Sequence, residues 1–165
     1  MSGPLVMVED ALAADLEAIA ALNNAAVPNV NALTPDEMAA IAAMGALRIT
    51  RTAGAVSGLV LTIPEGRPYD SANYRWFSGQ FDTFLYVDRV VVAPEARGLG
   101  VGRALYMDTF ARTQSLGRPR VCAEVNVEPP NPGSMAFHAA MGFNVLLDRF
   151  NESAGKTVRM MERPV

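Results

Sequence analysis

The sequence is poor in the residues from which covalent cross-links and metal sites are built. Its 165 residues include one cysteine, Cys122, and one histidine, His138. A single cysteine excludes an intramolecular disulfide, and one histidine beside it provides no cluster of metal ligands. We therefore expect no bound metal. Because free thiols persist in reducing compartments, we also expect a cytoplasmic location.

Long hydrophobic runs and an excess of basic charge are missing as well. No apolar segment approaches the roughly 20 residues that span a bilayer. The first residues lack the charged start and apolar stretch of a signal peptide. The net charge of −3 argues against nucleic-acid binding, which requires a basic surface to neutralise phosphates. We expect neither a membrane nor a nucleic acid among the partners of this chain.

The remaining composition is that of a globular protein. Half of the residues are hydrophobic and 19% are charged, which argues against disorder. The length suits one domain over residues 1–165, and the sequence contains no repeat or flexible linker.

Hydrophobic periodicity and turn residues predict alternating strands and helices. Strands are expected at residues 5–8, 46–52, 56–63, 83–92, 120–127, 143–150 and 157–161, and helices at residues 12–24, 34–44, 100–115 and 134–141. The aromatic and polar residues 64–80 are expected to form a long loop. The strand at 83–92, the next helix and the strand at 120–127 form a βαβ unit, so these two strands should be parallel. The predicted fold class is α/β with a mixed sheet.

The segment after the strand at residues 83–92 carries the clearest chemical signal. Gly98, Gly100 and Gly102 alternate at the start of a predicted helix, between Arg97 and Arg103. The first N–H groups of a helix have no intrahelical acceptor, and the helix dipole adds partial positive charge there. Because glycines let an anion approach the backbone, the segment predicts a site for phosphate or pyrophosphate.

Two nucleotide-binding patterns fit this segment less well. A P-loop requires Lys followed by Ser or Thr after its last glycine, and the chain lacks this pair here. A dinucleotide fingerprint requires a third glycine where Arg103 stands. Glu124 on the next predicted strand would match the ribose-binding acid of that fingerprint, so a dinucleotide oxidoreductase stays as a third alternative.

Two sequence blocks in this order resemble the GNAT superfamily of N-acetyltransferases. The first is the pattern R-x-x-G-x-G at residues 97–102, after a valine-rich strand and a proline. The second comprises N-P-G-S, F-H and G-F within residues 131–143. The resemblance implies a mostly antiparallel sheet with flanking helices, in which one parallel pair of strands splays apart to bind acetyl-CoA. It further implies an N-acetyltransferase with acetyl-CoA as cosubstrate and, as is frequent in the family, a homodimer.

The same resemblance assigns the residues that bind acetyl-CoA. The pantetheine arm would pair with the backbone of the last valines of the strand, and the pyrophosphate would lie on the glycine turn. The implied cofactor-binding residues are Val90, Val91, Val92, Arg97, Gly98, Leu99, Gly100, Val101, Gly102, Arg103, Asn131 and Ser134.

Acyl transfer to an amine requires a base for the ammonium and a donor for the departing thiolate. Glu124 is the preferred base because related enzymes often carry a catalytic Glu on this strand, with Asp88 in reserve. His138 stands where the family commonly has a tyrosine that protonates the thiolate; it either acts as that acid or packs beside the sulfur. Cys122 shares strand parity with Glu124, but a buried apolar role suits it better than a nucleophilic one.

Aromatic residues indicate where the acceptor binds. Tyr74 and Trp76 lie in the predicted loop before the strand that carries Tyr86, and we expect these three side chains to contact the acceptor. The alternative for the loop residues is a satellite core beneath it. The acceptor itself is a small-molecule or peptide amine. The competing function is an acyl-CoA or nucleotide binding module without transferase activity.

Overall fold

The computed structural model describes residues 5–165 of the chain. Its strands form one mixed sheet in the order β1-β2-β3-β4-β5-β7-β6. The pairing of β4 with β5 is parallel, whereas β1 with β2, β2 with β3, β5 with β7 and β6 with β7 are antiparallel. The predicted α/β class, with a mostly antiparallel sheet and one parallel pair, is confirmed.

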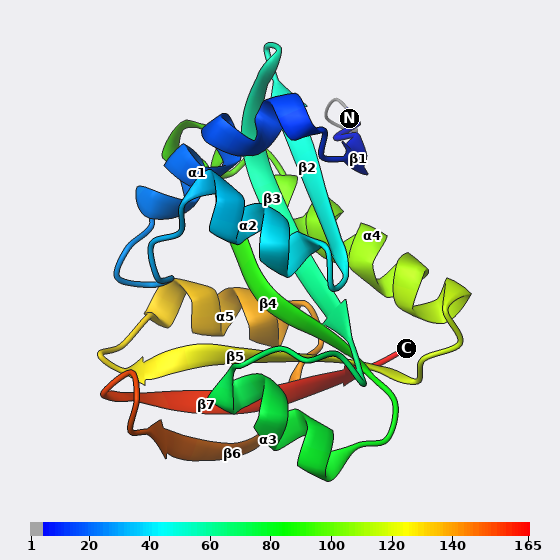
Figure 1. Cartoon of the computed structure of the whole chain (residues 1–165), viewed down its shortest axis with the longest axis vertical. Helices are drawn as coiled ribbons and strands as arrows, with labels where there is room; N and C mark the ends of the chain where they lie inside the picture. Colours follow the sequence, from blue (N-terminus) through cyan, green and yellow to red (C-terminus); the bar gives the residue numbers. More distant parts are fainter. Residues whose placement is uncertain (1–4) are drawn as a thin grey trace. The chain divides into compact units, whose positions relative to one another are not determined.

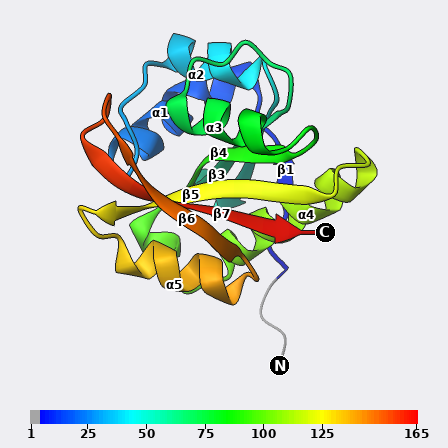
Figure 2. The same cartoon turned by 90° about the horizontal axis from the view of Figure 1, so that it is seen from below.

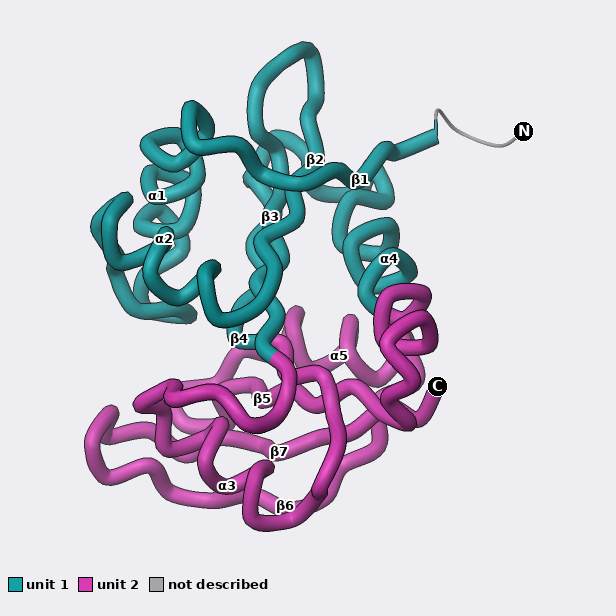
Figure 3. The backbone as a smooth tube through the Cα atoms, turned by 45° about the vertical axis from the view of Figure 1, so that its right-hand side comes forward, with its two compact units in different colours: residues 1–63, 88–109 teal, residues 64–87, 110–165 magenta. Residues whose placement is uncertain are grey.

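The chain divides into two compact units (Figure 3). Unit 1 comprises Met1–Ile63, of which residues 1–4 lie outside the described part, and Asp88–Thr109. Unit 2 comprises Pro64–Val87 and Phe110–Val165. The strand β4 (Leu85–Val92) and the helix α4 (Val101–Ser115) each begin in one unit and end in the other.

Unit 1 is a three-stranded meander, extended by the end of β4, with helices on both faces (Figure 1). Its elements are β1 (Val8–Asp10), α1 (Leu16–Asn24), α2 (Pro35–Ala42), β2 (Ala46–Thr52) and β3 (Ala55–Pro64). The cluster of buried apolar side chains under α1 and α2 is Ile19, Leu33, Met38, Leu47, Ile49, Leu59, Leu61 and Val91. Thr34 caps α2, since its hydroxyl accepts from Glu37 N at 3.1 Å.

The opposite face of β2 and β3 carries the start of α4. Alternation along a strand turns Gly58 away from the α1–α2 side. A Cβ built on Gly58 would lie 2.6 Å from Val101 Cγ1 and 2.9 Å from Thr50 Oγ1. The missing side chain therefore lets the first turn of α4 lie directly on β3.

Unit 2 is built on three antiparallel strands: β5 (Arg120–Glu128), β7 (Lys156–Pro164) and β6 (Asn144–Asn151). The helices α3 (Ala72–Gln80) and α5 (Pro132–Ala140) lie on opposite sides of these strands (Figure 2). The start of β4 pairs in parallel with β5 at Leu85↔Val121 and Tyr86↔Cys122, so the predicted βαβ unit is confirmed.

The expected loop at residues 64–80 is wrong in its second half, which forms α3. Ser71 caps this helix by accepting a hydrogen bond from Tyr74 N at 3.3 Å. Tyr74 and Phe77, three residues apart, are both buried and pack against other aromatic rings. Aromatic residues have modest helix propensity, and tertiary burial of this face outweighs that local preference.

The first strand is also displaced from its expected position at residues 5–8, because β1 begins at Val8. Leu5 and Met7 are exposed, at 85% and 68%. Arg51 on β2 forms an ion pair with Glu9 at 2.6 Å, and Arg48 forms one with Asp10 at 2.9 Å. The position at which this edge strand pairs with β2 therefore follows the cross-strand charge pairs and not the apolar run at residues 5–8.

Substitution of Gly58 by valine tests the contact between β3 and α4. The new side chain would overlap Val101 and Thr50, so we expect unfolding free energy to fall by about 1–3 kcal/mol, as for other overpacked cores. Denaturant unfolding measures the change. Gly79→Ala is the matched control, because it lies in α3 with open space around its Cβ position and should keep or raise stability. Equal stability of Gly58→Val and the native chain would contradict the proposed packing.

Candidate functional site

The glycine turn that precedes α4 leaves a series of backbone donors available. Gly98 and Gly100 have φ angles of +79° and +81°, which side-chain-bearing residues rarely adopt. In the part of the chain that the structure describes, no protein acceptor is seen for the N–H groups of Gly98, Gly100 or residues 101–103. Open space surrounds the Cβ positions of Gly98 and Gly100. The turn thus has the properties of an anion-binding site at a helix N-terminus.

The arginines on either side of this turn are available to the same anion. Arg97 and Arg103 are exposed, and neither forms an ion pair with a described carboxylate. Leu99 is 56% exposed, whereas Val101 is buried and anchors the helix. The preceding strand ends with Val90, Val91 and Val92, of which Val91 packs into the core of unit 1. Unit 1 therefore brings together the predicted residues from 90 to 103.

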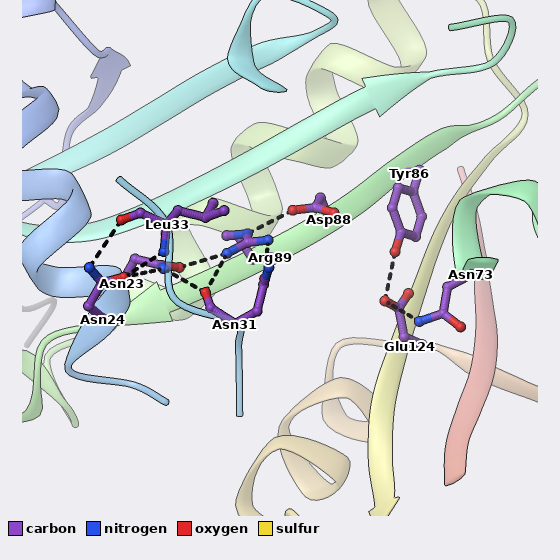
Figure 4. Close-up of polar contacts among 9 residues, drawn as sticks. All are labelled: Asn23, Asn24, Asn31, Leu33, Asn73, Tyr86, Asp88, Arg89 and Glu124. Atoms are coloured by element: carbon purple, nitrogen blue, oxygen red, sulfur yellow. Dashed lines mark hydrogen bonds and ion pairs between the residues drawn. The ribbon is translucent and has the colours of Figure 1, made fainter. Parts of the chain in front are cut away.

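Asp88, the reserve base, is engaged in a buried ion pair. Its Oδ2 lies 2.7 Å from Nε of Arg89, and both side chains are only 5% exposed. Arg89 also donates to Asn23 Oδ1 at 3.0 Å and to Asn31 Oδ1 at 2.8 Å (Figure 4). This network attaches β4 to α1 and to the loop between α1 and α2. Arg89 and Asn31 are not among the predicted site residues.

Glu124, the preferred base, is held by two hydrogen bonds on the α3 face of β5. Tyr86 donates its hydroxyl hydrogen to Glu124 Oε1 at 2.6 Å, and Asn73 Nδ2 donates to the same oxygen at 3.1 Å (Figure 4). Arg149 Nη1 in turn donates to Asn73 Oδ1 at 3.2 Å. The residue as a whole is partly exposed, its Oε2 atom is buried, and its carboxylate is kept in one orientation by a tyrosine that is itself 1% exposed.

Asn73 and Arg149 were missed by the sequence reasoning. Asn73 lies in the segment that we expected to be a loop, and Arg149 lies on a strand whose sequence shows no motif. The sequence alone contains no signal that places either residue beside Glu124, since the contact depends on α3 covering this face of the sheet.

Tyr86, Tyr74 and Trp76 occupy three different environments. Tyr86 contacts Glu124, as described. Tyr74 is 2% exposed, donates to the carbonyl oxygen of Pro64 at 2.6 Å and packs on Phe84 and Tyr86. Trp76 packs on Phe77 with ring centroids 5.2 Å apart. The aromatic residues of this segment therefore build a satellite core, and Tyr74 also borders a cavity of about 550 Å³ lined by Tyr69, Arg75 and neighbouring residues.

His138 is buried on α5 and hydrogen-bonded to its own helix. Its Nδ1 lies 2.7 Å from the carbonyl oxygen of Ser134, and the ring packs against Phe137 and Phe143. A carbonyl oxygen only accepts, so Nδ1 carries the hydrogen and the neutral ring has none at Nε2. Burial lowers the pKa of His138 below its ordinary value near 6.5. This arrangement favours the packing role over that of a proton donor.

The contacts of Asn131 and the burial of Cys122, both in unit 2, are structural. Asn131 caps α5, because its Oδ1 accepts from Ser134 N at 3.4 Å. Cys122 is fully buried, and burial raises the pKa of its thiol far above the physiological range. A neutral thiol is a poor nucleophile, so this geometry favours the apolar role.

Among the described residues, no group of three or more His, Cys, Asp or Glu side chains is arranged to hold a metal ion. None of the described helices combines the length and apolar character needed to cross a bilayer.

Together, the mixed sheet and the glycine turn before α4 define an α/β protein with a candidate anion site. The family model that matches this chain is the acetyltransferase (GNAT) family, over residues 36–143. The match covers more than half of the chain, and the chain belongs to this family. The chain is therefore an acetyltransferase that uses acetyl-CoA and acts on an amine, which confirms the predicted class and cosubstrate.

Solved structures share the fold at low sequence identity. A phosphinothricin acetyltransferase from Sinorhizobium meliloti in complex with AcCoA is 24% identical, with a TM-score of 0.72, over 97% of this chain and 88% of that chain. A ribosomal-protein-alanine N-acetyltransferase from Brucella melitensis is 22% identical, with a TM-score of 0.72, over 96% and 99%. Ard1 from Thermoplasma volcanium has a TM-score of 0.78 at 16% identity, over 97% of each chain. A search among curated proteins found no match.

The pH dependence of stability tests the state of His138. Because burial lowers the folded-state pKa, the unfolded chain binds more protons at pH values below about 6.5. The contribution of a neutral His138 is present above that pH and is lost as the pH falls through it. We expect the native chain to lose more stability between pH 7 and 5 than a His138→Gln variant. NMR titration of this single imidazole should give a pKa below 6.5; a higher value would contradict the burial argument.

Proposed function

We propose that residues 90–92 and 98–103 bind acetyl-CoA, with its pyrophosphate on the glycine turn. The observation that carries this proposal is the series of backbone N–H groups at Gly98, Gly100 and residues 101–103 for which no protein acceptor is described. Arg97 and Arg103 supply further charge-assisted hydrogen bonds to the phosphates. The backbone of Val90, Val91 and Val92 pairs with the amides of the pantetheine arm in the manner of an added strand.

The acceptor in this proposal is a primary amine that attacks the thioester directly. An alkylammonium has a pKa of about 10 and must lose a proton before its nitrogen can attack. Glu124 takes that proton, directly or through a water molecule. The new bond joins the amine nitrogen to the acetyl carbon and the bond from that carbon to sulfur breaks. The nitrogen then releases its second proton to water, which leaves a neutral amide, and CoA leaves as a thiolate that water protonates. A thiolate is a good leaving group because the thiol pKa is only about 8.5.

The contacts of Glu124 and Asp88 support the choice between them. Asp88 is nearly fully buried beside Arg89, and removing its charge would leave a buried guanidinium without its carboxylate. Glu124 is partly exposed and is positioned by neutral donors. Asp88 therefore has a structural role in this proposal, and His138 packs within α5. Tyr86 acts as a positioning residue for Glu124, while Asn131 and Ser134 shape the start of α5.

The domain count, the oligomeric state and the location of the protein remain predictions. The expectation of one domain over residues 1–165 rests on the length of the chain, and that of a homodimer rests on the resemblance. The cytoplasmic location, with no nucleic-acid partner, rests on the single free cysteine and the acidic net charge.

Calorimetry on Gly100→Ala tests the pyrophosphate site. The added methyl group would occupy the approach to the backbone N–H groups, so we expect CoA to bind at least tenfold more weakly. Pantetheine, which lacks the pyrophosphate, should bind both proteins equally. Gly117→Ala is the matched control, because Gly117 also has a positive φ and open surroundings but follows the other end of α4. Equal loss of CoA binding in the two variants would overturn the assignment.

Replacement of Glu124 by glutamine tests the base. We expect kcat with a panel of primary amines to fall by about 100-fold or more, a typical contribution of general-base catalysis. Higher pH should partly restore turnover, because more of the amine is then neutral. Release of CoA thiol from acetyl-CoA measures the rate. Glu128→Gln, an exposed change on the same strand, serves as the control. Unchanged turnover of Glu124→Gln would exclude this role.

A further inference from the structure

Four arginines of unit 2, Arg67, Arg112, Arg149 and Arg163, form no ion pair with a described carboxylate, and Arg149 is distinguished by its hydrogen bond to the side-chain amide that also contacts Glu124. Arg75, Arg118, Arg120 and Arg159 each form an ion pair with a carboxylate. Arg149 donates through Nη1 to Asn73 Oδ1, and no described carboxylate forms an ion pair with it. Its side chain is half-buried. A guanidinium has five N–H donors, so this one contact leaves most of its binding capacity to a ligand.

The sheet register places Arg149 on the same face as Glu124. Glu124 on β5 pairs with Met160 on β7, and Arg149 on β6 pairs with Val158, two residues along β7. Residues paired across strands share a face, and so do residues two apart along one strand. Glu124 and Arg149 therefore point to the side that α3 partly covers.

Asn73 on α3 connects the two charged groups. Its amide nitrogen donates to Glu124 at 3.1 Å, while its amide oxygen accepts from Arg149 at 3.2 Å. One side-chain amide therefore separates the guanidinium from the carboxylate. An acceptor whose amine reaches Glu124 would have Arg149 within a few bond lengths of that amine.

We propose that Arg149 binds a carboxylate of the acceptor, so that the substrate class is amines that carry a carboxylate, namely free amino acids. The proposal rests on the proposed role of Glu124 at the amine. A guanidinium binds a carboxylate through two parallel hydrogen bonds, which fix orientation as well as charge. The acceptor would then be oriented at both ends: its anionic group lies at β6 and its amine lies at β5. Simple alkylamines and amino-acid amides would lack the first of these contacts.

Matched acceptor pairs test this specificity. The panel contains the twenty standard amino acids, β-alanine and 4-aminobutyrate, each with its carboxamide, so that the distance between amine and carboxylate also varies. Thiol release gives kcat and KM for each. We expect at least one amino acid to be acetylated in preference to its amide. In Arg149→Gln, KM for that amino acid should rise at least tenfold, while KM for the amide and for acetyl-CoA stays unchanged.

Two further variants show whether the rise in KM comes from the lost guanidinium contact or from a general effect of removing an arginine. Arg149→Lys keeps the charge without the paired donors and should give an intermediate KM for the amino acid. Arg159→Gln is the control, because Arg159 lies on the neighbouring strand and is engaged with Asp148 at 2.8 Å. Circular dichroism confirms that each variant is folded.

The outcomes distinguish this proposal from the proposed function. Acetylation of amides or alkylamines that depends on Glu124, without any preference for carboxylates, would overturn the role of Arg149 alone. Equal losses on amino acids and amides in Arg149→Gln would do the same, as would a preference for peptides without acidic side chains. Release of CoA from no amine would overturn both proposals.

Discussion

Backbone N–H groups in the glycine turn, for which the described residues supply no acceptor, are the feature on which the proposed acetyl-CoA site of unit 1 depends. They exist because Gly98 and Gly100 adopt positive φ angles just before α4, and because Gly58 lets the first turn of α4 lie against β3. A rigid helix start pointing at an anion requires no rearrangement when the ligand arrives, so little binding energy is lost to ordering. The packing of a sheet face thus determines where the proposed anion site lies.

In unit 2 a satellite core supports Glu124, the proposed base, in a comparable way. Tyr74 and Phe77 pack on the ring of Tyr86, Phe84 packs on Tyr74 and Phe77, and the hydroxyl of Tyr86 reaches Glu124. A carboxylate held by donors on a packed scaffold has few orientations to lose, which suits proton transfer. In the proposed function, the aromatic segment therefore supports the base, and the acceptor contacts expected of Tyr74 and Trp76 stay predictions.

The elements that sequence reasoning located well are those with strong local signals. The helix α2, the strands β2 and β3 and the βαβ unit appear where periodicity and turn residues indicate them. The helix α3 and the strand β1 were misplaced because neither depends on its own sequence alone. Burial of one aromatic face stabilises α3, and ion pairs with Arg48 and Arg51 set the register of β1.

The sequence by itself determined the family, the cosubstrate and the glycine turn, because the residues that specify them are contiguous and their spacing carries the chemistry. Only the tertiary structure decided which polar groups meet: Asp88 with Arg89, Ser134 with His138, and Glu124 with Tyr86, Asn73 and, through Asn73, Arg149. Asn73 and Arg149 are 76 residues apart. Contacts between residues so far apart in the sequence depend on strand register and on which helix covers which face of the sheet. Neither can be inferred from a local sequence pattern.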